Sequence, residues 1–188
     1  MRRTAVISGF LGILLAVLPA HADEIEVRDV ALYSVDEGLA LDADFAFELT
    51  PRLADVVANG VPVYFRVDFE LTRHRWYWFD ENTASRRLQI RLSYHALSRQ
   101  YRLSTGALQQ SFPTLEEALN VLKRVRNWLV VDRSARLGSA DYDAAVRMRL
   151  DTTLLPKPFQ LSALTRRDLH LESPWKRFIV RAPQVPKR

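Results

Sequence analysis

The residues best suited to binding chemistry stand close together near the middle of the chain. They are two arginines, one histidine and two tryptophans: Arg73, His74, Arg75, Trp76 and Trp78. Indole rings beside cationic side chains can stack on sugars, contact lipid headgroups or anchor a partner protein. We therefore take these five residues as the candidate binding surface.

The strand that leads into this surface leaves two alternatives for it. Apolar and polar residues alternate over residues 63–72, which predicts a half-buried strand. Continued further, the alternation places Arg73 and Arg75 on the buried face, where unpaired charges are costly. The strand must then either bulge near residues 72–75 or project beyond the fold as a long hairpin. The hairpin would expose both tryptophans, whereas a cover formed by residues 175–178, the commoner arrangement for such rings, would bury them.

The chain lacks the spacings on which catalytic and metal sites depend. It has no cysteine, which excludes disulfides, thiolate catalysis and cysteine-ligated zinc. None of its six glycines belongs to a nucleophile elbow, and His74, His95 and His170 are too scattered to place two imidazoles on one metal. We predict that the protein is not an enzyme and has no catalytic residue, metal ligand or cofactor.

Charged residues fall on the outward faces of several predicted strands. A carboxylate-lined sheet face, of the kind that glycoside hydrolysis needs, would require the acidic strands to be neighbours, and outward charge that keeps a sheet soluble is the commoner use. The acidic residues are Asp42, Asp44, Glu48, Asp68 and Glu70. Farther along, Asp141 and Asp143 share a strand face with Arg147 and Arg149, so we expect an ion-paired ladder there.

The N-terminus predicts export. Arg2 and Arg3 precede an apolar run over residues 5–18 and the small-x-small sequence Ala20–Ala22, which is the order of a secretory signal peptide. We expect cleavage after Ala22 and a periplasmic protein, with an uncleaved N-terminal anchor as the alternative. Removal of 22 of the 188 residues leaves 166, with 25 basic and 22 acidic side chains. The resulting net charge of +3 is too small to indicate nucleic acid as a partner.

The remaining chain has the pattern of one β-rich domain. Strands are expected over residues 25–32, with an irregularity at Asp29, and over 39–49, 63–72, 88–94, 101–103, 142–150, 168–171 and 175–180. Asp36–Gly38 is expected to form the first hairpin turn. A short helix is predicted after the N-cap Thr50, and a longer amphipathic helix runs from the N-cap Thr114 to Leu129.

This series of elements has no alternation of strand, helix and strand. It favours a mainly β fold, an antiparallel β-sandwich with immunoglobulin-like general architecture and one short and one longer helix in its connections. The predicted organisation is a signal peptide over residues 1–22, a single domain over residues 23–182 and a disordered basic tail over residues 183–188.

One bacterial family shares several of these features. They are the signal peptide, the opening hairpin, Trp76–Trp78, and the later segments Arg147–Asp151, Leu155–Pro158 and Asp168 with Ser173–Trp175. In these features the chain resembles the DUF4390 proteins of proteobacteria, which are exported and of unknown function. The resemblance implies a gene position near a membrane sensor kinase of the nitrogen-regulation type, and it supplies no catalytic or ligand-binding residue.

Together these observations predict an exported binding protein. We expect a non-enzymatic accessory module that binds a membrane or envelope protein, and a membrane sensor kinase is one form of that partner. The alternative is a carbohydrate- or lipid-binding module that uses Trp76 and Trp78 as an aromatic platform for a glycan or lipid. A purely structural envelope protein is a third class, which the sequence does not separate from the first.

Overall fold

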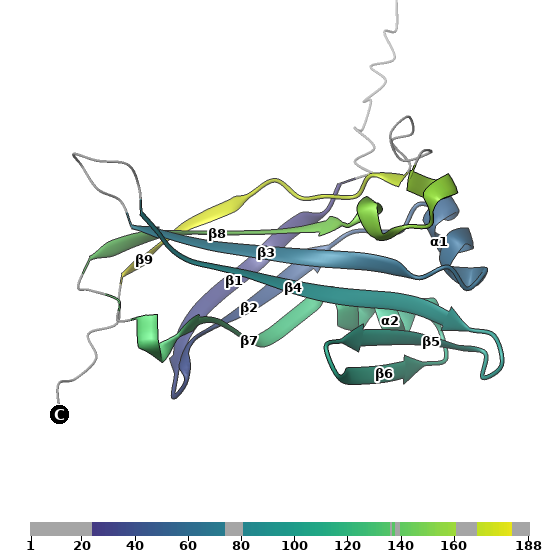
Figure 1. The fold of residues 1–188 in the computed structure, drawn as a ribbon, viewed down its shortest axis with the longest axis horizontal. Helices are drawn as coiled ribbons and strands as arrows, with labels where there is room; N and C mark the ends of the chain where they lie inside the picture. Colours follow the sequence, from purple (N-terminus) through teal and green to yellow (C-terminus); the bar gives the residue numbers. More distant parts are fainter. Residues whose placement is uncertain (1–23, 74–80, 136, 138–139, 161–168, 182–188) are drawn as a thin grey trace, which may run out of the picture.

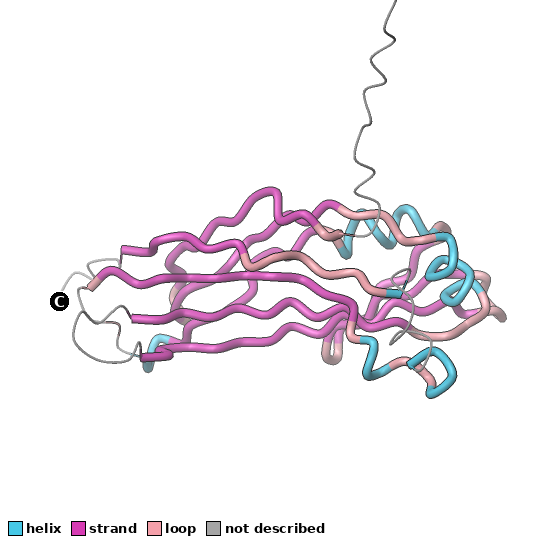
Figure 2. Tube along the Cα trace, turned by 90° about the horizontal axis from the view of Figure 1, so that it is seen from above, coloured by secondary structure: helices cyan, strands magenta, loops and turns pink. Residues whose placement is uncertain are grey.

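The computed structural model describes residues 24–73, 81–135, 137, 140–160 and 169–181. Its fold is mainly β, with two antiparallel sheets packed as a sandwich, which confirms the predicted fold class (Figure 1). Strands run along the long axis of the molecule, and helical turns gather mainly at one end (Figure 2). The signal peptide with its cleavage site and the C-terminal tail lie outside the described residues and stay predictions.

The smaller sheet has three strands in the order β1-β2-β7. They are β1 (Glu26–Val35), β2 (Gly38–Ala46) and β7 (Arg124–Asp132). Asp36 and Glu37 form the turn that joins β1 to β2, and Gly38, the last residue of the predicted turn, is the first residue of β2 with φ of +151°. A Cβ at this position would lie 2.0 Å from the carbonyl oxygen of Val131, so only glycine fits there. The register shift between Val27 and Asp29 confirms the expected irregularity.

The larger sheet has six strands in the order β6-β5-β4-β3-β8-β9. They are β3 (Val63–Arg73), β4 (Glu81–His95), β5 (Gln100–Thr105), β6 (Leu108–Phe112), β8 (Asp141–Leu150) and β9 (Lys176–Arg181). The register of β3 against β4 shifts between Leu71 and Thr72, where Thr83 of β4 is the extra residue. The bulge therefore lies in β4, whereas the predicted bulge was in the strand that carries Arg73, and β3 itself runs without an extra residue to Arg73.

One predicted strand is wrong in its described part. Leu169–Leu171 does not form a strand, because the segment meets β8 only through an isolated bridge between Glu172 and Arg149. Its two leucines are buried nonetheless, which produced the apolar alternation seen in the sequence.

Two helices of eight residues lie in the connections, and both begin where predicted. α1 (Pro51–Ala58) follows Thr50, whose Oγ1 accepts a hydrogen bond from the backbone N–H of Leu53 at 3.2 Å. α2 (Leu115–Leu122) follows Thr114, which caps Glu117 in the same way. Short 3₁₀ helices η1 (Arg133–Ala135) and η2 (Thr152–Leu154) follow β7 and β8.

The expected longer helix is wrong in its extent. α2 ends at Leu122, and the following residues form β7. The β-branched residues Val125, Val130 and Val131 favour a strand there, and pairing with β2 satisfies the backbone of β7. Leucines at helical spacing thus continued by chance into a strand.

The core fills the space between the two sheets. Phe47 stacks on Phe65 with ring centroids 5.3 Å apart, and Phe69 of β3 meets Trp128 of β7 edge-on at 6.5 Å. Because β3 faces the core with alternate residues, its remaining side chains lie on the outer face of the larger sheet. Over the described part of the chain, no helix is long and apolar enough to cross a membrane.

Candidate functional site

The structure describes one of the five residues of the candidate binding surface. Arg73 is the last residue of β3, half-buried and opposite Glu81 of β4 and Tyr142 of β8. The other four residues, 74–76 and 78, lie outside the described residues. The candidate surface therefore stays a prediction.

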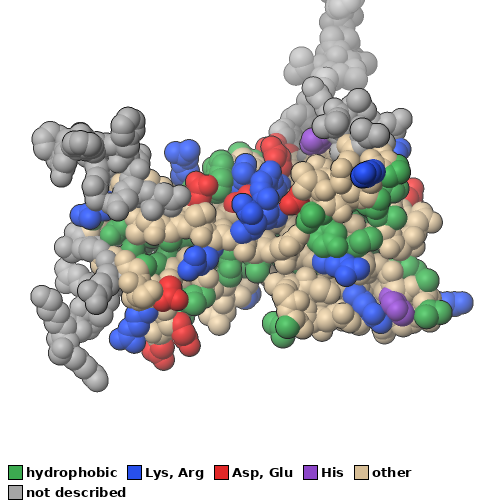
Figure 3. All heavy atoms as spheres, viewed as in Figure 1, with side chains coloured by type: hydrophobic (Ala, Val, Ile, Leu, Met, Phe, Trp, Pro, Cys, Tyr) green, Lys and Arg blue, Asp and Glu red, His purple; other side chains and the backbone are tan. Residues whose placement is uncertain are grey.

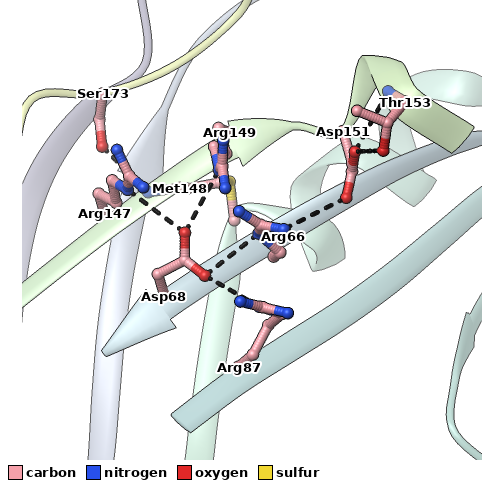
Figure 4. A network of polar contacts seen from close by, with 9 residues as sticks. All are labelled: Arg66, Asp68, Arg87, Arg147, Met148, Arg149, Asp151, Thr153 and Ser173. Carbon is pink, nitrogen blue, oxygen red and sulfur yellow. Dashed lines mark hydrogen bonds and ion pairs between the residues drawn. The ribbon is translucent and has the colours of Figure 1, made fainter. Parts of the chain in front are cut away.

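A different group of charged residues is brought together on the outer face of the six-stranded sheet. β3 contributes Arg66 and Asp68, β4 contributes Arg87, and β8 contributes Arg147 and Arg149 (Figure 4). We call Asp68 with these four arginines the arginine cluster. Figure 3 views this side of the molecule and shows basic side chains gathered over β3 and β8.

Strand register brings the members of the arginine cluster together. Asp68 lies directly opposite Arg87 on one neighbouring strand and Arg147 on the other. Two residues earlier on β3, Arg66 lies opposite Arg149. Since side chains on a strand alternate between faces, all five point to the same side of the sheet.

The Asp68 carboxylate contacts all four guanidinium groups. Its Oδ1 lies 3.1 Å from Arg66 Nε and 3.3 Å from Arg87 Nε. Its Oδ2 lies 3.3 Å from both Arg147 Nε and Arg149 Nε. The side chain of Asp68 is only 11% exposed, so the carboxylate depends on these cations in place of water.

Only two of these contacts have hydrogen-bond geometry. Arg87 Nε donates to Oδ1 of Asp68, and Arg147 Nε donates to Oδ2. Arg66 Nε and Arg149 Nε are buried at ion-pair distance, yet they have no hydrogen-bond acceptor among the described residues. Asp68 has four ion pairs but only two hydrogen bonds with the arginines, because an ion pair requires only proximity, whereas a hydrogen bond also requires alignment. Alignment decides whether a donor is satisfied, so one carboxylate does not satisfy four guanidinium groups.

A second carboxylate at the end of β8 helps to hold Arg66. Arg66 Nη1 lies 3.5 Å from Asp151 Oδ2. Asp151 Oδ1 also accepts a hydrogen bond from the backbone N–H of Thr153 at 3.2 Å, which caps η2. This carboxylate is therefore shared between the arginine cluster and the helix cap.

The segment after residue 171 supports the cluster from the side of β8. Ser173 and Met148 exchange two hydrogen bonds, from Met148 N to Ser173 Oγ at 3.0 Å and from Ser173 N to Met148 O at 2.8 Å. The Trp175 ring then lies against the guanidinium of Arg147, with its centroid 4.4 Å from the guanidinium carbon. Such cation–π stacking restricts the orientation of the arginine.

The expected ladder on β8 is wrong about the partners of the two arginines. Arg147 and Arg149 pair with Asp68 of β3, whereas Asp141 and Asp143 lie four or more positions earlier on β8. A strand rises by about 3.3 Å per residue, so four positions are too far for an ion pair. The signal available in the sequence was the pair Arg147 and Arg149 on the outward face of β8 and the acidic pair Asp68 and Glu70 on the outward face of β3.

The carboxylate-lined face does not form as a shared surface. Asp42 and Asp44 lie on β2 of the small sheet, whereas Asp68 and Glu70 lie on β3 of the large one. Within the described ranges, no three His, Asp or Glu side chains are placed to hold a metal ion.

A depression lies beside the first residues of the edge strand β1. It has a volume of about 1290 Å³ and is lined by Glu24–Asp29, by residues 44–48 at the end of β2 and just after it, by Asn120 and Lys123 at the end of α2, by the start of β7 and by Pro174–Lys176. We call it the β1 groove. Its floor is apolar, since Ile25, Phe45 and Phe47 line it and are almost fully buried.

The rim of the β1 groove is charged but balanced. Five acidic side chains (Glu24, Glu26, Asp29, Asp44 and Glu48) and five basic ones (Arg28, Lys123, Arg124, Arg126 and Lys176) line it. Lys123 Nζ lies 5.4 Å from the centre of the Phe47 ring, so one of the cations covers the aromatic floor. The groove therefore offers apolar contacts within a rim that has equal numbers of acidic and basic side chains.

One family model matches a range of the chain that includes both the arginine cluster and the β1 groove. Residues 22–179 match the model described as "Domain of unknown function (DUF4390)". The chain belongs to this family. The resemblance noted in the sequence is thereby confirmed, and the matched range contains the arginine cluster, the β1 groove and both sheets except the last two residues of β9. Comparisons with curated proteins and with solved structures gave no match.

Proposed function

We propose that this DUF4390 protein is an exported, non-enzymatic binding module of the cell envelope. Its partner is another protein, an extended segment of which lies in the β1 groove. The observation that supports this proposal is that the first residues of the edge strand β1 line one side of the groove. A sheet edge with an adjacent depression can receive an added strand, whose side chains enter the depression.

The edge of β1 is available over most of its length. Along the described chain, β1 pairs with β2 on one side, and residue 24, just before β1, forms a single bridge with Glu172. The bulge at Val27–Asp29 and the charges around it protect this edge against indiscriminate pairing. An added segment must therefore fit the bulge and the charges, which makes the groove selective.

The balanced rim favours a protein segment over a uniformly charged polymer. Charged groups across an interface select partners by complementary potential, and a rim with equal numbers of both signs complements a chain of mixed charge. The buried apolar floor suits apolar side chains that alternate with the charged ones. A membrane sensor kinase, suggested by the family resemblance, is one candidate source of such a segment.

Site-specific crosslinking in the native host tests the proposal. Because the chain has no cysteine, one introduced cysteine is a unique attachment point for a photo-crosslinker. We expect R28C and D29C, on the groove, to crosslink to one envelope protein at positions close together in that protein's sequence. Leu97, which is 94% exposed in the turn after β4, supplies the matched control L97C.

Two results would contradict the groove as the binding surface. They are equal crosslinking of the same protein from position 97, or failure of both groove positions to crosslink a protein. The intact mass of the recovered chain tests export separately, because cleavage after Ala22 leaves a chain that begins at Asp23. A full-length chain would contradict cleavage and leave the groove proposal standing.

The alternative of a carbohydrate- or lipid-binding module stays a prediction. It rests on Trp76 and Trp78, which lie outside the described residues.

A further inference from the structure

The arginine cluster carries more positive charge than its own carboxylates neutralise, and the surplus faces a surface depression. This depression has a volume of about 340 Å³ and is lined by the whole cluster together with Arg86, Glu70 and Ser85. Arg86 stands opposite the buried Phe69, so its side chain belongs to the other face of β4 and is not counted. The four guanidinium groups of the cluster form ion pairs with two carboxylates among the described residues, those of Asp68 and Asp151, a surplus of two positive charges over their partners. Glu70 on the rim and Glu172, opposite Arg149 on the neighbouring segment, are the other acids nearby, and neither forms an ion pair with an arginine of the cluster in the described part of the chain.

This surplus opposes folding. Arg66 and Arg149 face each other directly across β3 and β8, and like charges in that position destabilise a sheet. A single carboxylate needs one or two arginines, and the additional ones add mainly mutual repulsion. A further anion at the surface would reduce this repulsion and accept hydrogen bonds from the partly exposed side chains of Arg147 and Arg149.

We propose that the arginine cluster binds a phosphoryl group with two negative charges, such as that of a phosphate monoester. Two negative charges match the surplus of the four guanidinium groups over the two carboxylates that pair with them. The planar fork of a guanidinium pairs with two phosphate oxygens at once, and a phosphoryl group has enough oxygens for arginines on different strands.

The exposure of the arginines agrees with this role. The side chains of Arg147 and Arg149 are 25% and 31% exposed, so both are reachable from solvent while their Nε atoms lie at ion-pair distance from Asp68. Arg147 is also held against the Trp175 ring. Pre-oriented cations of this kind lose little conformational entropy when a ligand binds.

This inference goes beyond the protein-binding function proposed above, because the arginine cluster contributes no residue to the β1 groove. The phosphoryl group could belong to a small soluble ester or to the headgroup of an envelope lipid. Both sources offer the same dianion to the arginines, and they are separated by experiment.

Calorimetric titration at constant ionic strength tests the site with inorganic phosphate and glucose 6-phosphate. We expect saturable binding to the wild-type protein, competition by sulfate, and no effect of chloride. The double variant R147M/R149M should bind at least about tenfold more weakly, because charge-assisted hydrogen bonds are lost. The control R91M removes an exposed arginine from the same face of β4, opposite Tyr64, and should bind like the wild type.

Vesicles distinguish the two sources. Binding to phosphatidic acid vesicles that free phosphate displaces, with none to phosphatidylcholine vesicles, identifies a lipid headgroup. Binding of the soluble ester alone identifies a small ligand, and either result supports the site. The proposal is overturned if none of the phosphate-bearing probes binds saturably, or if R147M/R149M binds as tightly as the wild type. Single R149M replaces the double variant should the latter fail to unfold cooperatively.

Discussion

Each sheet of the sandwich carries a polar cluster on its outer face, and the two are built in opposite ways. On the three-stranded sheet, Asp42 accepts hydrogen bonds from the Tyr33 hydroxyl at 2.9 Å and from the backbone N–H of Asn127 at 2.8 Å. Its neighbour Asp44 pairs with Arg126, which also donates to two backbone carbonyl groups. We call these five residues the Asp42 cluster. Here acceptors match the donors, whereas donors exceed acceptors in the arginine cluster.

The difference separates a cluster that completes the fold from one that has donors to spare. The β2–β7 register shifts between Leu41 and Ala43, and Asn127 has a left-handed φ of 49° at this irregularity. Asp42 stabilises that conformation through the Asn127 N–H, so the Asp42 cluster serves its own backbone. The arginine cluster lies on a regular stretch of β3 that needs no such support. Its surplus is therefore available to a ligand.

Removal of the Asp68 carboxylate should have the largest effect on stability. It tests the arginine cluster's half of the comparison. D68N leaves four guanidinium groups facing one another around a neutral amide, so we expect unfolding to become easier by about 3 kcal/mol or more. Urea denaturation measures the loss. Phosphate should restore part of it if the dianion substitutes for Asp68 at the surface.

The matched control for D68N is D143N, which neutralises an exposed acid on the outer face of β8. We expect it to change stability by less than about 0.5 kcal/mol. Equal stability of D68N and D143N would mean that Asp68 does not hold the arginines together.

The fold was largely predictable because its main signals are local, and the candidate site was not. Alternation marked β3 and β8, and the caps Thr50 and Thr114 marked the helix starts. β6 has no such alternation, since four of its five residues are exposed, and it was missed. The partners of Asp68 lie 19 and 79 residues away, at Arg87 and Arg147. Only the order of strands in the sheet, which no local pattern encodes, puts them together.

Removal of one arginine from each cluster should sharpen the comparison through opposite effects on stability. R126M deprives Asp44 and two backbone carbonyl groups of their donor, so we expect a loss of about 1 kcal/mol. R149M keeps the apolar stem and removes the cross-strand repulsion with Arg66. In phosphate-free buffer it should therefore match or exceed the stability of the wild type.

Thermal and urea denaturation at low ionic strength measure both effects. Salt should narrow the gap between the two variants, because it screens the repulsion that R149M relieves. If R149M lost more stability than R126M, the arginine cluster would be a closed structural network like the Asp42 cluster.

The smallest expected effect is on the pKa of Tyr33, whose hydroxyl donates a hydrogen bond to the Asp42 carboxylate. Its hydrogen bond with the Tyr33 hydroxyl raises the pKa of that phenol above its usual value near 10.0. A raised pKa in the folded state stabilises the protein fully below the unfolded pKa, and this contribution is lost as pH rises through the folded pKa. The stability difference between the wild type and Y33F should therefore be constant below about pH 10 and shrink above it.

Spectrophotometric titration of the tyrosines measures the pKa shift directly. The wild type should show one phenol that ionises at a higher pH than the others, a late phenol that is absent in Y33F. In D42N the pKa of the same phenol should fall back toward its usual value, because Asp42 supplies the leading cause of the shift. A late phenol that persists in D42N would mean that Asp42 is not committed to Tyr33, and the contrast between the closed and the open cluster would lose its basis.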